Sequence, residues 1–131
     1  MPLVWNVEES SRVVRMRYVD PVAFTEWREA HNASLPAMSG DRSVGMLIDR
    51  RDVPPLATAF AQAIASYLAS HRNIFEGRRI AILVTVAGDA CYGMARMQGY
   101  LNGSAGAVTA VFTSEREAIA WLTSPDPSPD S

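Results

Sequence analysis

The stretch 79-RIAILVTVAGDACYGMARM-97 decides the fold class. It opens with the apolar run 80-IAILVTV-86, which is typical of a central strand that is covered on both faces. Asp89 then supplies an N-cap, and residues 89–101 are predicted to form a helix. The spacing of the apolar residues predicts its buried stripe: Ala90, Met94, Met97 and Leu101. A strand that leads directly into a helix is the repeating unit of α/β folds.

Similar strand signals occur on both sides of this stretch. The run 44-VGMLID-49 predicts a second central strand, and 107-AVTAVF-112 predicts the last one. Residues 3–7 and 13–18 predict two short strands that form a hairpin. Three more helices are predicted, at about 21–36, 55–71 and 115–122.

The order of these elements predicts an α/β fold. Strands that alternate with helices favour parallel pairing through right-handed crossovers, and the first hairpin adds an antiparallel edge. We therefore expect a mixed, mostly parallel β-sheet with an N-terminal antiparallel hairpin and about four helices. Residues 1–122 are predicted to form a single domain, and the Pro-, Asp- and Ser-rich tail 123–131 to be disordered.

Two of the helices carry further signals. Asp20 and Pro21 predict the start of the first helix, with Phe24, Trp27 and His31 on one stripe and an end near Pro36. The helix at 55–71 has no charge on any face. Its polar side chains recur every four residues: Thr58, Gln62, Ser66 and Ser70. Such a helix is expected to be covered, either by this chain or by a second copy in a homodimer around Phe60, Ile64 and Tyr67.

Composition narrows the function classes. The chain has 131 residues, 48% of them hydrophobic, and a formal net charge of −2, so it lacks the general basic field that attracts nucleic acid. One cysteine rules out an internal disulfide. The sequence shows no signal-peptide pattern and no run apolar enough to span a membrane, which predicts a cytoplasmic protein. No metal or cofactor is predicted.

Charged residues gather where the predicted strands end. Asp49, Asp52 and Asp89 are expected to lie near one another, with Arg50, Arg51 and Arg96 close by. The acidic residues could hold magnesium. We favour the simpler interpretation, in which Asp89 caps a helix and Asp49 pairs with an arginine, because no phosphate-binding glycine loop accompanies them.

Cys91 lies near the predicted start of a helix, where the thiol pKa is often lowered. A catalytic cysteine also needs a base beside it, and neither histidine is placed near Cys91 by the sequence. A small buried residue is therefore the favoured interpretation, and an enzyme that uses Cys91 or the Asp49 and Asp89 pair is the less favoured one.

The same helix offers two candidate binding features. Tyr92 and Arg96 are four residues apart and share a face, which favours a surface contact or a ligand contact. Four methionines could line an adaptable apolar cavity: Met38, Met46, Met94 and Met97.

Three stretches together resemble the STAS-like, or SpoIIAA-like, family of small bacterial proteins: 46-MLIDRRDVP-54, 79-RIAILVTVAGDACYGMARM-97 and 111-VFTSEREAIAWL-122. The resemblance implies a mixed sheet with helices packed against it, and a protein that is not an enzyme. It also implies either an anti-sigma factor antagonist, switched by a phosphorylated serine after the strand that ends at Asp49, or a domain that holds an apolar or lipid-like ligand. Residues 50–57 contain no serine or threonine, which disfavours that switch.

We therefore expect a non-enzymatic STAS-like module that binds a small apolar or lipid-like ligand or a regulatory protein partner. The candidate ligand-binding residues are Asp49, Arg50, Asp89, Tyr92, Met94, Arg96 and Met97.

Overall fold

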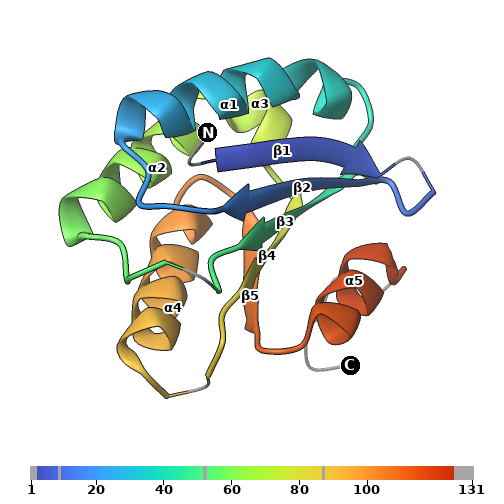
Figure 1. Cartoon of the computed structure of the whole chain (residues 1–131). Helices are drawn as coiled ribbons and strands as arrows, with labels where there is room; N and C mark the ends of the chain where they lie inside the picture. Colours follow the sequence, from blue (N-terminus) through green and yellow to red (C-terminus); the bar gives the residue numbers. More distant parts are fainter. Residues whose placement is uncertain (1–2, 9, 52, 87, 126–131) are drawn as a thin grey trace.

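A computed structural model describes residues 3–8, 10–51, 53–86 and 88–125 (Figure 1). It contains five strands and five helices within these ranges. The strands are β1 (Leu3–Glu8), β2 (Val13–Tyr18), β3 (Gly45–Asp49), β4 (Arg79–Leu83) and β5 (Val108–Phe112). The helices are α1 (Phe24–Met38), α2 (Thr58–Ser70), α3 (Arg72–Phe75), α4 (Ala90–Gly103) and α5 (Glu115–Thr123).

The strands form one sheet in the order β1-β2-β3-β4-β5, so neighbours in the sequence are also neighbours in space. β1 pairs antiparallel with β2, and Leu3 faces Tyr18 across the hairpin. β2, β3, β4 and β5 pair in parallel, because a helical crossover returns the chain to the same end of the sheet each time. The predicted mixed sheet with an antiparallel N-terminal edge is confirmed.

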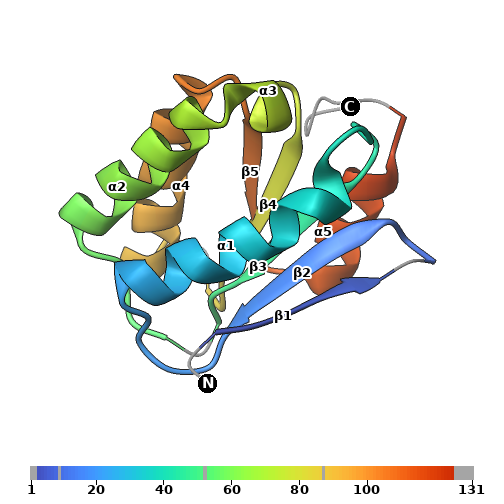
Figure 2. The ribbon, with the colours of Figure 1, turned by 90° about the horizontal axis from the view of Figure 1, so that it is seen from above.

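Helices cover both faces of the sheet, so the protein has two apolar clusters. On one face Met46 and Ile48 of β3 pack in a cluster with residues of α1, α2, α3 and α4. On the other face Leu47 packs with Ala118 and Leu122 of α5. Figures 1 and 2 show α5 apart from the other helices, across the sheet. Every residue of β3 is buried, as its continuous apolar run predicted.

α1 begins later than predicted. Asp20 and Pro21 lie in the preceding turn, Ala23 is the N-cap residue, and the first helical residue is Phe24. The helix also continues past Pro36 to Met38. Proline can stand there because it removes only the bond to the carbonyl of residue 32, and Asn32 is exposed to water. Trp27 and His31 are buried on the predicted stripe.

The predicted buried stripe of α4 is wrong by one residue. Ala90 is exposed, and Met94, Met97 and Leu101 are only half-buried. The buried residues are instead Ala95, Gln98 and Asn102. Two polar residues can occupy this face because the Gln98 amide donates to Asn102 Oδ1 at 2.7 Å and to the Ala61 carbonyl of α2 at 3.2 Å.

The exposed side of α2 is the uncharged stripe that the sequence predicted. Thr58, Gln62, Ser66 and Ser70 are all exposed in this single chain, while Ile64 and Tyr67 point into the apolar cluster. No described helix is long and apolar enough to cross a membrane. α5 extends to Thr123, and residues 126–131 of the predicted tail lie outside the described residues.

Gly45 of β3 provides a test of how closely α5 packs. A Cβ atom at this position would lie 2.8 Å from Leu122 Cδ2 and 3.3 Å from Leu122 Cβ. We expect Gly45→Ala to lower the free energy of unfolding by ~1–3 kcal/mol through overpacking. Chemical denaturation monitored by circular dichroism measures the change.

Gly93→Ala is the matched control, because no atom lies within 4 Å of the added Cβ and the residue is inside α4. That variant should be as stable as the wild type, or more stable by up to ~1 kcal/mol. Equal stability of the two variants would show that α5 does not pack against Gly45 as described.

Candidate functional site

The carboxyl end of β3 directs two consecutive charged residues to opposite faces of the sheet. Asp49 lies on the face that α5 covers, where it contacts Arg51. Arg50 lies on the face covered by α1, α2 and α4, where it lines a cavity with Trp27 and Ile64. Its backbone N–H donates to the Leu83 carbonyl at 3.0 Å, which continues the pairing of β3 with β4. Because side chains alternate between the two faces along a strand, the Asp49 carboxylate and the Arg50 guanidinium lie on opposite sides of the sheet.

Arg50 is buried without a charge partner among the described residues. It is 7% exposed, and its Nε has no hydrogen-bond partner. The guanidinium lies over the Tyr18 ring, 5.4 Å from the centroid. Such a contact contributes up to ~2 kcal/mol. Removal of an ion from water costs several kcal/mol, so the Tyr18 ring alone does not balance this charge.

The groups around Arg50 are neutral. Burial lowers the pKa of His31 to about 3, against its backbone hydrogen bond, and the Arg50 charge lowers this pKa further. His31 Nδ1 lies 2.9 Å from the Trp27 carbonyl, which can only accept, so this nitrogen carries the proton of the neutral ring. Burial raises the pKa of Tyr18, although the charge of Arg50 and polar contacts with Arg50 and Trp27 oppose it. No described group lies in ordinary hydrogen-bond geometry with the Tyr18 hydroxyl. Neither ring supplies a negative charge near neutral pH.

Gln98 adds an unused acceptor to the same region. Its amide nitrogen donates to the Ala61 carbonyl, which fixes the orientation of the amide, since a carbonyl cannot donate. The other atom of the amide, Oε1, is buried and has no partner. Asn102 continues the hydrogen bonds to Thr109 of β5, at 3.4 Å.

Two small cavities meet at Arg50. The first has a volume of about 20 Å³ and lies between the sheet and α1, α2 and α4. Its walls are formed by Trp27, His31, Met46, Ile48, Arg50, Ile64, Leu68, Ile80, Ile82, Gln98 and Asn102. The second, of about 10 Å³, lies under the loop before α2. Its walls are formed by Arg50, Val53, Pro54, Pro55, Leu56, Val84, Cys91 and Met94.

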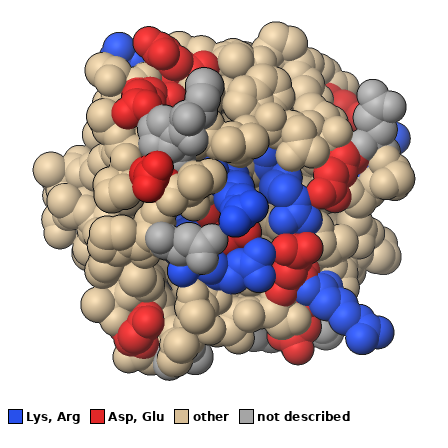
Figure 3. All heavy atoms as spheres, viewed as in Figure 1, with Lys and Arg blue, Asp and Glu red and all other residues tan. Residues whose placement is uncertain are grey.

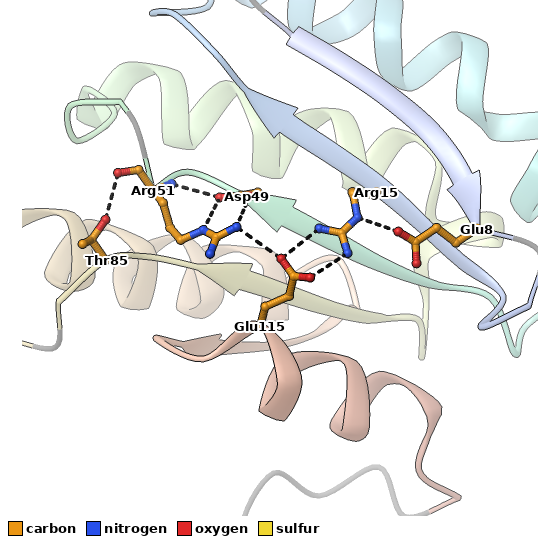
Figure 4. Close-up of polar contacts among 6 residues, drawn as sticks. All are labelled: Glu8, Arg15, Asp49, Arg51, Thr85 and Glu115. Atoms are coloured by element: carbon orange, nitrogen blue, oxygen red, sulfur yellow. Dashed lines mark hydrogen bonds and ion pairs between the residues drawn. The ribbon is translucent and has the colours of Figure 1, made fainter.

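On the α5 face, by contrast, the charges are paired (Figure 4). Arg15 donates to Glu8 at 2.8 Å and to both carboxylate oxygens of Glu115 at 3.2 Å. Arg51 joins Glu115 to Asp49, with distances of 3.2 and 2.8 Å. Burial raises the Asp49 pKa, but the hydrogen bonds and charge of Arg51 outweigh it, and the net pKa is lowered. Figure 3 shows arginine and acidic side chains side by side on this part of the surface.

A wider groove, of about 540 Å³, lies at the amino ends of β3 and β4. Its arginines are also engaged. Arg12 forms an ion pair with Asp41, Arg42 donates to the backbone carbonyls of residues 73 and 76, and Arg79 donates to the Trp121 carbonyl. The charges of this groove are therefore used to hold loops together.

The structure disperses the seven predicted site residues. Asp49 lies on the α5 face, and the Asp89 carboxylate accepts from the Tyr92 N–H at 2.9 Å as the helix cap. Among the described residues no three His, Cys, Asp or Glu side chains are placed to hold a metal ion. Asp52 lies outside the described residues. The favoured interpretation of Asp49 and Asp89, as an ion pair and a cap, agrees with these contacts.

The remaining predicted residues lie on two different surfaces. Arg96 lies over the Tyr92 ring at 6.0 Å, and both line a groove of about 530 Å³ beside β5. Arg50 and Met94 line the cavities described above, whereas Met97 is half-buried elsewhere on α4. The sequence did not indicate Tyr18, Gln98 or Asn102. The signal available was the spacing of Gln98 and Asn102, which are four apart on one face of a helix.

Cys91 does not have the surroundings of a nucleophile. Its thiol donates to the Val53 carbonyl at 3.7 Å. Burial and the nearby Asp89 raise the pKa of the Cys91 thiol, so the lower pKa expected from its position at a helix start does not occur. A thiol with a raised pKa is a weak nucleophile near neutral pH.

Comparison with known proteins supports the fold. The crystal structure of an uncharacterized protein from the DUF3478 family, from Shewanella loihica PV-4, is described as having a SpoIIAA-like fold. It superposes on this chain with a TM-score of 0.67 and 18% sequence identity, over 92% of this chain and 93% of the other. The chain therefore has a SpoIIAA-like, or STAS-like, fold. The sequence matches no protein-family model and no curated protein.

Glu115 is expected to hold the charges of the α5 face together. Hydrogen bonds from Arg15 lower the Glu115 pKa, and burial opposes this only in part. We expect Glu115→Gln to lower the free energy of unfolding at pH 7 by only ~1 kcal/mol, since Glu115 is partly exposed. A lowered pKa means that this stability is present above the ordinary value of 4.5 and is lost as the pH falls through the lowered pKa.

Urea denaturation at several pH values measures this, with Glu117→Gln as the control. Glu117 lies in the same first turn of α5, and no ion pair to it is described. A difference between the two variants that persists in strong acid would contradict the assigned role of Glu115.

The thiol of Cys91 can be tested by iodoacetamide labelling near neutral pH, followed by mass spectrometry. We expect the folded protein to react more slowly than the same protein unfolded in urea, because only the thiolate reacts and the folded pKa is raised above 9.0. Faster labelling of the folded protein would restore Cys91 as a candidate nucleophile.

Proposed function

We propose that this protein is a non-enzymatic binding module that holds a small apolar or amphipathic ligand between its sheet and helices α1, α2 and α4. The observation that carries this proposal is the pair of cavities that meet at Arg50, at the carboxyl ends of β3 and β4. Ligands of open α/β sheets collect outside these strand ends.

The lining of the cavities supports a binding role. Most of the walls are apolar, while a few polar groups point toward one region: the Arg50 guanidinium, the Gln98 amide and the His31 ring. This combination is typical of small-molecule sites. The volumes, about 20 and 10 Å³, are each close to the space that one water molecule needs, so an organic ligand enters only when neighbouring side chains move aside. A longer lipid-like chain would require half-buried side chains such as Leu56 and Met94 to move aside.

The titratable groups support binding without catalysis. Covalent catalysis needs an activated nucleophile with a base beside it. The Cys91 thiol donates a hydrogen bond to a backbone carbonyl, and its pKa is raised. His31 Nδ1 is engaged by the Trp27 carbonyl in the interior.

A regulatory protein partner, or a second copy of the chain, is the second candidate. It is supported by the exposed, uncharged side of α2, which carries Thr58, Gln62, Ser66 and Ser70. An exposed helix face that has no charge is unusual unless another surface covers it. The loop after Asp49 contains no serine or threonine up to Thr58, which argues against a phosphorylation switch in that loop.

Native mass spectrometry of the purified protein, incubated with a lipid and metabolite extract, tests the proposal. We expect the protein to retain a small molecule that is released on denaturation. Retention of no small molecule would contradict the ligand proposal. If the protein is then dimeric in the same spectrum, the second candidate is favoured instead.

A further inference from the structure

We infer that Arg50 binds the carboxylate group of the ligand, so that the protein takes a small monocarboxylic acid with a short apolar body. This inference rests on the proposed function and names the chemical class of its ligand. It starts from a guanidinium that is 7% exposed, lines two cavities and has a buried Nε without a partner.

A second buried arginine in the same protein shows how this side chain is satisfied when its role is structural. Arg78 is 1% exposed and donates to four backbone carbonyls. The acceptors are the carbonyls of Ile74, Asp41, Val44 and Met38, at 3.0, 3.0, 2.6 and 2.9 Å. Arg50 Nε has no acceptor, and the contact described for the rest of the guanidinium is with Tyr18, which carries no charge. The two residues have similar burial, so burial alone does not explain the unpaired state of Arg50.

The charge of the site selects a monoanion. Arg50 contributes one positive charge, and the described groups nearest to it, His31 and Tyr18, are neutral near pH 7. A water molecule would satisfy a hydrogen bond but would leave the charge unbalanced. One carboxylate balances it and matches the planar fork of a guanidinium in a bidentate pair. A phosphate dianion would bring a second charge into an interior that has no further cation on its walls.

The walls select the rest of the ligand. Next to Arg50, the first cavity is bounded by Trp27, Ile48, Ile64 and Ile82, which suit an apolar body. Gln98 Oε1 is the unused acceptor on the same walls, so a hydroxyl group on the ligand could donate to it. The first cavity, of about 20 Å³, has room for little more than one water molecule as described, so a ligand requires side chains on its walls to move, and acids with few carbon atoms require the least movement.

Titration with sodium butyrate, followed by the NMR signal of the Trp27 indole, tests this inference. Butyramide, a neutral compound of the same shape, and inorganic phosphate are the comparison ligands. The variant is Arg50→Met, which keeps an unbranched apolar stem and removes the guanidinium and its charge. Arg116→Met is the control, because Arg116 is exposed on α5 and lines neither cavity.

We expect butyrate to bind to the wild type and to Arg116→Met, and to bind about tenfold or more weakly to Arg50→Met. Butyramide should bind weakly to all three proteins. Without ligand, Arg50→Met should have a Tm several degrees higher than the wild type, because an unbalanced buried charge has been removed.

Three results would overturn the inference: equal binding of butyramide and butyrate, stronger binding of phosphate than of butyrate, or no binding of butyrate at all. In each case a small molecule retained in the native mass spectrum would leave the proposed function standing. A lower Tm of ligand-free Arg50→Met, together with unchanged butyrate binding, would show that Arg50 is structural.

Discussion

The arrangement of the site depends on one constraint, which is the alternation of side chains at the end of β3. Asp49 and Arg50 are consecutive and therefore lie on opposite faces of the sheet. Asp49 is paired with Arg51 on the α5 face, as part of a chain of charges that reaches Glu115. The Arg50 side chain is buried beside the larger apolar cluster, without an acidic partner among the described residues. Among the described residues, Asp49 is therefore paired on the α5 face, whereas Arg50 has no charge partner on the other face.

The described side chains around Arg50 are uncharged near neutral pH, so they do not neutralise its guanidinium. His31 stays neutral because burial and the nearby guanidinium both disfavour its protonated form. Tyr18 supplies an aromatic ring and keeps its proton. The Gln98 amide nitrogen donates to Asn102 and to a carbonyl of α2, whereas Gln98 Oε1 has no partner. Natural proteins often keep such unsatisfied groups where a ligand is bound, and their interior is then less stable than an apolar one of the same shape.

The sequence was sufficient for the sheet and insufficient for the site. Continuous apolar runs located β3 and β4, because a strand that is covered on both faces carries apolar residues on both sides. Periodicity misplaced the buried face of α4, since it gives weight to apolar residues, whereas Gln98 and Asn102 are buried through hydrogen bonds to α2 and β5. Asp20 and Pro21 similarly suggested an early start for α1, which the chain does not use. Asp49 and Asp89 were expected to be neighbours because both lie near strand ends. In the structure Asp49 pairs with Arg51 on the α5 face, and Asp89 accepts from the Tyr92 N–H as a helix cap.

The central claim is that Arg50 has no charge partner among the described residues and is available to a carboxylate. A high-resolution crystal structure of the protein grown with butyrate tests it most directly. The account predicts density for a carboxylate within hydrogen-bond distance of the Arg50 guanidinium, with the apolar body of the ligand against Trp27 and Ile64. An Arg50 side chain that is paired with a carboxylate of the protein, or turned out into solvent, would contradict it.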